Sequence, residues 1–156
     1  MSNITECLRI WIPVKPEPQE RVRIKFTGWG KRRRASAYYP DKTRDYQQYL
    51  RLYMRAVMAE YFIGQLPKDE PLYLKAVFVI PRPKSVTVKK RPFPITRPDL
   101  SNYLKSLEDG IQSVKEEISI LPDDSAIIDI HIQKQYVDEF YPEIGVDIEM
   151  GVKYVR

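Results

Sequence analysis

The strongest constraint on the fold is the proline-dense segment PRPKSVTVKKRPFPITRP, from Pro81 to Pro98, which holds five prolines and several basic residues. Each proline fixes φ and removes a backbone N–H donor, so neither a helix nor a central strand can run through such a segment. The segment therefore predicts an extended, flexible basic loop over 81–98 that separates two structured parts of the chain.

The part before this loop alternates between strand-like and helical patterns. LRIWIP (Leu8–Pro13) and RVRIKF (Arg21–Phe26) alternate as strands do. TGWGKRRRASAYYP, residues 27–40, fits no core pattern, so we expect a second flexible basic loop there. The spacing of apolar residues is helical over 41–62, and LYLKAVFVI (Leu72–Ile80) is apolar enough to be a central strand.

The part after the loop predicts one helix, at about 99–114, and two strands, at 125–137 and 144–155. The element order is then roughly β-β-α-β-α-β-β. This order predicts a single domain over residues 1–156, with a mixed α/β (α+β) fold made of one mixed sheet and two main helices.

Composition excludes several classes of protein. The chain has 156 residues, of which 43% are hydrophobic, and this argues against overall disorder. One cysteine and one histidine exclude an internal disulfide, an all-cysteine metal site and a His-rich zinc site. The apolar runs are too short to cross a bilayer and the N-terminus has no apolar signal core. We expect a soluble, cytoplasmic protein with no membrane partner.

Charge is distributed unevenly along the chain. Residues 1–98 carry 21 Lys and Arg against 8 Asp and Glu, whereas residues 99–156 carry 5 against 13. Two interpretations stay open. A basic part that holds phosphates could serve an acidic part that holds cations, or the two parts could neutralise each other across an intramolecular or dimer contact.

The predicted helix RPDLSNYLKSLEDGI, residues 97–111, has two different faces. On a wheel of about 100° per residue, an apolar stripe faces the core, and Asn102, Lys105 and Asp109 lie on the opposite side. Asp99 at the helix start is either a cap or a metal ligand. The stripe consists of Leu100, Leu104, Leu107 and Ile111.

A second acidic segment, LPDDSAI (residues 121–127), follows this helix. Asp123 and Asp124 alone would be typical of a turn. Together with Asp99, Lys105 and the basic half, they fit metal-dependent cleavage of phosphodiesters. In that chemistry carboxylates hold Mg²⁺, a metal-bound water attacks, and a cation stabilises charge on the phosphate.

Four segments, in order and over nearly the whole chain, resemble the RusA family of Holliday junction resolvases, which are common in bacteriophages and prophages. Two of them are RPDLSNYLKSLEDGI, which is similar to the family's D-L-D-N-x-x-K helix, and LPDDSAI, which is similar to its downstream DD segment. The other two are IPVKPEPQERVRI (12–24) and YYPDKTRDYQQYL (39–50).

The resemblance implies a role for each matching residue. Asp99 would be a metal ligand, Asn102 and Lys105 fall on the family's Asn and functional Lys, and Asp124 falls on the later catalytic carboxylate, with Asp123 beside it. It also implies a homodimer that uses Mg²⁺, with Mn²⁺ as a substitute and no small-molecule cofactor. Such a dimer nicks opposite strands of four-way DNA junctions, in recombination and repair, inside a bacterial host cell.

Ser101 departs from the family pattern, which has a second Asp there. Since a hydroxyl is a poor ligand for a hard cation, a compensating carboxylate is needed for full activity. Glu108 lies about 20° from Ser101 on the wheel, and side chains lean toward the helix start, so we expect Glu108 to serve as a metal ligand, with Asp109 as second candidate. The alternative is a weakened or inactive dimer that binds branched DNA or another protein.

Basic residues outside this helix predict DNA contacts. For Arg21 and Arg23, a solvated strand face is the competing interpretation. Trp29 and Phe93 either stack on opened bases or pack beneath their own loops. The predicted DNA-binding residues are Arg21, Arg23, Lys31, Arg32, Arg33, Arg34, Lys89, Lys90, Arg91 and Asn102.

Overall fold

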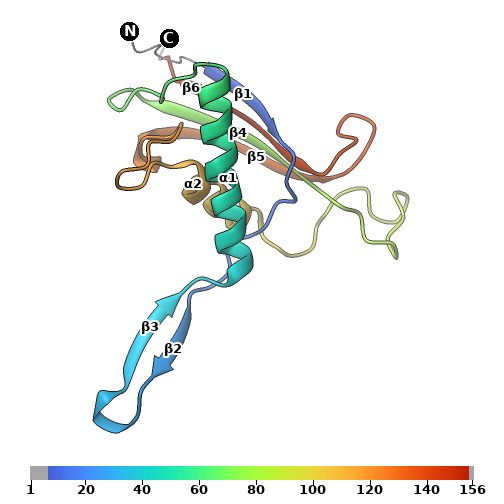
Figure 1. Ribbon diagram of the computed structural model, residues 1–156. Coiled ribbons are helices and arrows are strands. Elements are labelled where there is room, and N and C mark those ends of the chain that lie inside the picture. The colour runs from blue at the N-terminus through green and yellow to red at the C-terminus, as the bar shows by residue number, and fades with distance from the viewer. Residues whose placement is uncertain (1–6, 155–156) are drawn as a thin grey trace.

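A mixed four-stranded sheet forms the centre of the computed structural model, which describes residues 7–154 (Figure 1). The strand order is β1-β6-β4-β5, with β4 and β5 parallel and the other two pairs antiparallel. The predicted central strand is confirmed, because β4 has a partner on both sides. The strands are β1 (Cys7–Ile12), β4 (Leu72–Ile80), β5 (Ile127–Tyr136) and β6 (Gly145–Val152).

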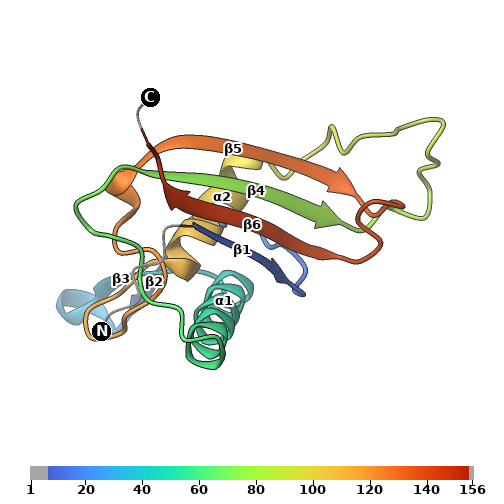
Figure 2. The ribbon, with the colours of Figure 1, turned by 90° about the horizontal axis from the view of Figure 1, so that it is seen from above.

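Two helices, α1 (Asp41–Glu60) and α2 (Leu100–Ile111), pack on the same face of this sheet (Figure 2). Alternate residues of β1, β4 and β6 point toward them and are mostly buried, as the period of two requires, whereas the edge strand β5 is largely exposed or half-buried. The core combines Leu74, Phe78 and Ile148 of the sheet with Leu50 of α1 and Leu107 of α2, all fully buried. The single mixed α+β domain predicted from the sequence is confirmed.

The two helices approach each other closely at Gly110 of α2. A Cβ atom at this position would lie 2.5 Å from Leu50 Cδ1 and 2.9 Å from Leu50 Cβ. No real Cβ makes contacts this short, so a side chain at Gly110 would force α1 and α2 apart. The crossing therefore depends on a glycine in the last turn of α2.

The predicted apolar stripe of α2 is confirmed in part. Leu107 and Ile111 are fully buried, while Leu100 and Leu104 are half-buried against the core. Tyr103 is also buried, and its ring stacks on Phe78 with 5.4 Å between centroids. The helix ends at Ile111, three residues before the predicted end at 114.

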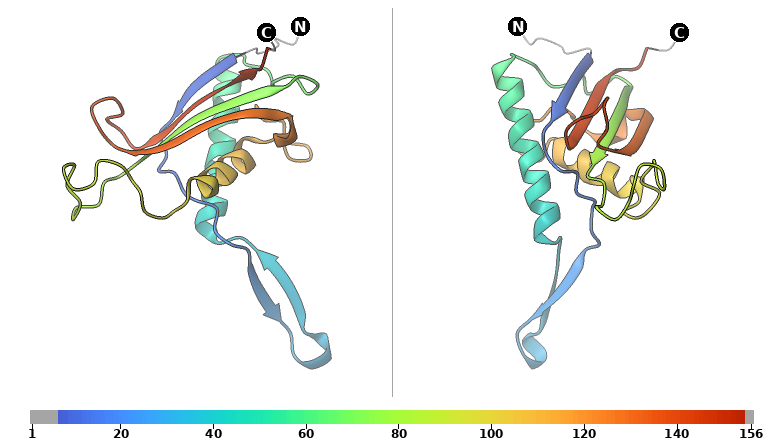
Figure 3. Two further views of the ribbon diagram at one scale, coloured as in Figure 1. Left: turned by 180° about the vertical axis from the view of Figure 1, so that it is seen from behind. Right: turned by 90° about the vertical axis from the view of Figure 1, so that its right-hand side faces the viewer.

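The prediction of a loop over 27–40 is wrong. This region contains a 3-10 turn, η1 (Gly30–Arg32), and a strand, β3 (Arg34–Tyr38), which pairs antiparallel with β2 (Arg23–Thr27). The hairpin projects away from the rest of the molecule (Figures 1 and 3), and we call residues 21–39 the arm. Residues 21–39 are all exposed, so Val22, Ile24 and Phe26 do not form the buried strand face that their alternation indicates.

The two faces of the arm differ in chemistry. Ile24 pairs with Ala37 and Phe26 with Ala35, which makes one face apolar. On the other face Lys25 pairs with Ser36, and Arg23 and Arg34 lie on the same side. The Arg33 guanidinium lies over the Phe26 ring, 4.2 Å from its centroid.

The segment 81–98 has no helix or strand, as its prolines predict. Its start is held by Arg82, whose guanidinium lies 4.2 Å from the centroid of the Tyr136 ring. Its end is held by Lys134 of β5, which donates hydrogen bonds to the carbonyl oxygens of Thr96 (2.7 Å) and Pro98 (2.8 Å). The Arg97–Pro98 peptide bond is cis.

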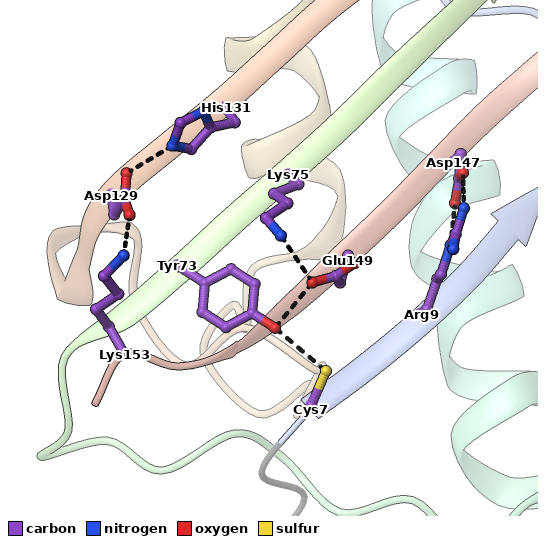
Figure 4. Close-up of polar contacts among 9 residues, drawn as sticks. All are labelled: Cys7, Arg9, Tyr73, Lys75, Asp129, His131, Asp147, Glu149 and Lys153. Carbon is purple, nitrogen blue, oxygen red and sulfur yellow. Dashed lines mark hydrogen bonds and ion pairs between the residues drawn. The ribbon is translucent and has the colours of Figure 1, made fainter. Parts of the chain in front are cut away.

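The face of the sheet opposite the helices carries charged side chains that pair with one another (Figure 4). Arg9 forms an ion pair with Asp147 at 2.9 Å, and Lys75 with Glu149 at 3.2 Å. Asp129 pairs with Lys153 on the same face. Acidic residues of the second half of the chain are thus neutralised within the sheet. No helix in the described part of the chain is long and apolar enough to cross a membrane.

Candidate active site

Asp99 occupies the position just before α2, with extended backbone angles of φ −70° and ψ 147°. Its carboxylate makes no capping hydrogen bond to the helix and its side chain is exposed. The Asp99 side chain therefore does not act as a helix cap in this structure. The carboxylate is available to solvent at the positive end of the helix dipole.

Lys105 lies between two carboxylates. Its Nζ atom is 3.1 Å from Oδ1 of Asp109, one turn further along α2, and 3.4 Å from Oδ2 of Asp124. The hydrogen bond to Asp109 is the main cause that raises the pKa of Lys105, burial opposes the shift, and Asp124 adds to it. Lys105 is therefore a persistent cation within an acidic cluster, which we define as Lys105, Glu108, Asp109 and Asp124.

The two aspartates of the DD segment have different surroundings. The Asp123 carboxylate accepts a hydrogen bond of 2.8 Å from the Ser125 N–H. Hydrogen bonding from the Ser125 hydroxyl, and then from its N–H, lowers the pKa of Asp123. The Asp123 carboxylate thereby caps the 3-10 turn η2 (Asp124–Ala126) that leads into β5. Asp124 instead faces Lys105 of α2. The structure thus brings Asp124 into the acidic cluster, while Asp123 fixes the turn that presents it.

Glu108 is half-buried and lies close enough to the cluster to be affected by its charges. Burial raises the pKa of Glu108, Asp124 and Asp109 raise it further, and Lys105 opposes them. Ser101, two turns earlier, is exposed. Asp109 and Asp124 both contact the Lys105 ammonium. As the carboxylate that accompanies Asp124, the structure therefore favours Asp109 over Glu108.

The carboxylates suit magnesium in their chemistry. Within residues 7–154, no three or more His, Cys, Asp or Glu side chains converge closely enough to hold a metal ion. Mg²⁺ nevertheless is usually bound through one or two carboxylates, water and substrate phosphates. Asp109 and Asp124, which contact one ammonium group, supply such a pair. Asp99 and Asp123 remain predicted ligands.

Two hydrogen bonds place the base of the arm at the start of α2 and of α1. The Gln19 N–H donates to the Asn102 carbonyl oxygen at 2.9 Å, and the Glu20 N–H donates to Thr43 Oγ1 at 3.4 Å. The segment 81–98 ends directly before Asp99. Both basic segments therefore meet at the first turn of α2.

Lys134 is a positioning residue that sequence analysis missed. Its two hydrogen bonds to Thr96 and Pro98 fix the segment that carries Asp99. The signal was present in the sequence. Ile130 and Ile132 define one face of β5, and Lys134 continues that face with a charge. A lysine in this register needs acceptors, and the carbonyl groups of a proline-rich segment supply them.

The predicted DNA-binding cations differ from the cations of the sheet in having few partners. Arg23 pairs with Glu20 at 3.2 Å, and Arg33 stacks on Phe26. The other side chains form no ion pair or hydrogen bond with any described residue, and they are exposed or half-buried. These are Arg21, Lys31, Arg32, Arg34, Lys89, Lys90 and Arg91.

The two aromatic residues beside these cations lie in solvent. Trp29 is 95% exposed and Phe93 is 67% exposed. The alternative in which both pack beneath their own loops is therefore wrong.

Comparison with known proteins gives one family and one relative. A family model described as endodeoxyribonuclease RusA matches residues 13–149. The chain is 27% identical over 155 residues to an uncharacterized protein, YqaN, of Bacillus subtilis (strain 168), and the match covers 92% of this chain and 96% of that protein. No solved structure gives a significant match.

Proposed function

Because the chain belongs to the RusA family of endodeoxyribonucleases, we propose that it is a Mg²⁺-dependent, structure-selective endonuclease that resolves four-way DNA junctions by paired symmetric nicks. The observation that carries this proposal is the ammonium of Lys105 between Asp109 and Asp124, on the helix whose first turn receives both basic segments. Carboxylates and a cation beside phosphate-binding segments are the parts that phosphodiester hydrolysis needs.

Lys105 is the residue proposed to stabilise charge on the phosphate. Its pKa is raised, so it stays protonated at neutral pH, and it is half-exposed, so a phosphate oxygen can reach it. When a phosphate displaces one carboxylate from Lys105, that carboxylate becomes free to bind a cation. Mg²⁺ would supply an activated water, and Asp109 and Asp124 would hold it together with water and phosphate oxygens, while Asp99 at the helix start stays a separately predicted ligand.

The unpaired cations of the arm and of the segment 81–98 are proposed to hold the DNA backbone. Cations without an acidic partner lose no ion pair when they bind phosphate, so their binding energy goes to the DNA. A homodimer with two-fold symmetry would place two such sites on a junction and allow symmetric nicks. Mn²⁺ is expected to replace Mg²⁺.

A second candidate function rests on Ser101. The serine stands where the resemblance implies a carboxylate, and it is exposed beside the start of α2. If neither Glu108 nor Asp109 replaces the missing ligand, the protein binds branched DNA, or another protein, without cutting.

The experiment that separates the two functions uses purified protein and a labelled synthetic four-way junction with Mg²⁺. The wild type is compared with Asp99→Asn, which keeps the shape of the side chain and removes its charge. Nicks at symmetric positions made only by the wild type support the endonuclease. Equal binding by both proteins, with no nicks in Mg²⁺ or Mn²⁺, supports the second function.

A further inference from the structure

Trp29 lies at the outermost end of the arm, in the turn between β2 and β3. Its side chain is 95% exposed, and it makes none of the ring stacking or cation–π contacts found among residues 7–154. A tryptophan in solvent at the end of a projecting hairpin contributes nothing to the folded core. Packing of the core therefore does not account for a tryptophan at this position.

The turn that carries Trp29 is tightly built. Gly28 and Gly30 on either side have φ values of +87° and +56°. A Cβ atom at Gly28 would lie 2.6 Å from the carbonyl oxygen of Arg32, so only glycine fits there. The Trp29 carbonyl oxygen accepts a hydrogen bond of 3.2 Å from the Arg32 N–H. The backbone of Trp29 is thus held, while its ring points into solvent.

The surroundings of Trp29 define the chemistry of its ligand. Residues 21–38 contain seven basic residues and no acidic one. Lys31 and Arg32, next to the turn, have no ion-pair partner among the described residues. A ligand for this surface therefore offers negative charge and, within a few ångströms, a flat apolar surface. A nucleic acid with unpaired or easily opened bases has both.

We propose that Trp29 stacks on exposed bases at the branch point of a DNA junction, while Lys31 and the arginines that follow it hold the adjacent phosphates. This inference rests on the proposed function, since it uses the same DNA substrate. It gives the arm a role that the acidic cluster cannot have, because stacking distinguishes a branch point from continuous duplex whereas phosphate contacts do not.

The test measures binding without metal, in EDTA, so that it does not depend on cleavage. The probes are a four-way junction with 2-aminopurine beside the branch point and a linear duplex of the same sequence. For Trp29→Ala we expect about tenfold weaker binding to the junction and duplex affinity within about twofold of wild type. The 2-aminopurine fluorescence should change when wild type binds and stay unchanged with the variant.

Two further variants serve as controls. Trp29→Phe keeps an aromatic ring and should retain most of the junction affinity. Phe140→Ala removes an aromatic side chain that is 80% exposed in the loop between β5 and β6, and it should bind both probes as wild type does. Thermal unfolding checks that all variants are folded, as expected for changes at exposed side chains.

Three results overturn the inference. One is that Trp29→Ala binds each probe with the same affinity as wild type does. Another is an equal loss of affinity for junction and duplex, which would make Trp29 a general contact. The third is a change in oligomeric state on sedimentation with junction binding intact, which would assign Trp29 to a protein interface. A wild type that binds the junction but never nicks it contradicts the proposed function and leaves this inference standing.

Discussion

The Nζ atom of Lys105 lies 3.4 Å from Oδ2 of Asp124, although the two residues are 19 positions apart in the sequence. The contact joins α2 to the turn before β5. It places a cation of α2 beside a carboxylate from a separate element, on the helix whose first turn receives the base of the arm and the end of the segment 81–98.

Replacing Lys105 by methionine should abolish most nicking of a four-way junction. The change removes the cation that faces the phosphate, and we expect the nicking rate to fall at least about 10²-fold. Lys105→Arg, which keeps the charge, should retain part of the rate. Lys153→Met is the matched control, because Lys153 pairs with Asp129 on the far face of the sheet. Equal nicking by Lys105→Met and wild type would contradict the role given to Lys105.

Replacing Glu108 by glutamine should stabilise the protein at neutral pH. The pKa of Glu108 is raised, chiefly by burial, so the folded state binds the proton more tightly than the unfolded chain. Ionisation of Glu108 therefore costs stability, and the cost appears as pH rises above the ordinary carboxyl pKa of about 4.3. Denaturant unfolding should show Glu108→Gln more stable at pH 7, with the difference disappearing toward pH 4.

The same variant tests whether Glu108 compensates for Ser101. If Glu108 is a metal ligand, Glu108→Gln should need more Mg²⁺ to nick a junction at half its maximal rate. If the compensating ligand is Asp109, the Mg²⁺ dependence of Glu108→Gln should match wild type, and that of Asp109→Asn should shift.

Neutralising the arm should weaken DNA binding in a salt-dependent way. Each lost phosphate contact reduces the slope of log K against log salt by about 0.9 on duplex DNA. The double variant Arg32→Gln, Arg34→Gln should therefore lower the affinity and reduce the slope by up to about 1.8, which corresponds to two lost contacts. The matched control is the double variant Lys68→Gln, Lys115→Gln, which changes net charge by the same amount at exposed residues outside the arm. An unchanged slope in the arm variant would exclude the arm from the DNA interface.

Replacing Gly110 by alanine should destabilise the fold without altering the acidic cluster. The new Cβ would clash with Leu50, and overpacking of this kind costs about 1–3 kcal/mol. Urea unfolding should show the loss in the midpoint. A variant as stable as wild type would mean that α1 and α2 can separate at no cost.

Sequence patterns predicted the elements that bury an apolar face. The apolar run of β4 and the helical spacing of α2 are clear patterns, so the type and approximate bounds of both elements could be predicted. The start of α2 was also evident, because Asp99 follows a proline. The wheel placed Asn102, Lys105 and Asp109 on one side of α2, and the contact between Lys105 and Asp109 agrees with it.

The arm could not be predicted, because its stability does not come from a buried face. The alternation of Val22, Ile24 and Phe26 indicates a strand with a covered side, whereas all three are exposed. β3 is short and follows a basic run, so it carries no strand pattern. Its pairing with β2 is a contact between segments, which a local pattern does not report.

The most direct test of the central claim is strand-resolved mapping of nicks in a synthetic four-way junction with Mg²⁺, made with wild type and Asp124→Asn. Binding is measured on the same samples in EDTA. We predict nicks at symmetric positions on two opposite strands with wild type, and none with Asp124→Asn, which should still bind. Binding without nicks by wild type in both Mg²⁺ and Mn²⁺, or the same nicks with Asp124→Asn, would contradict the account.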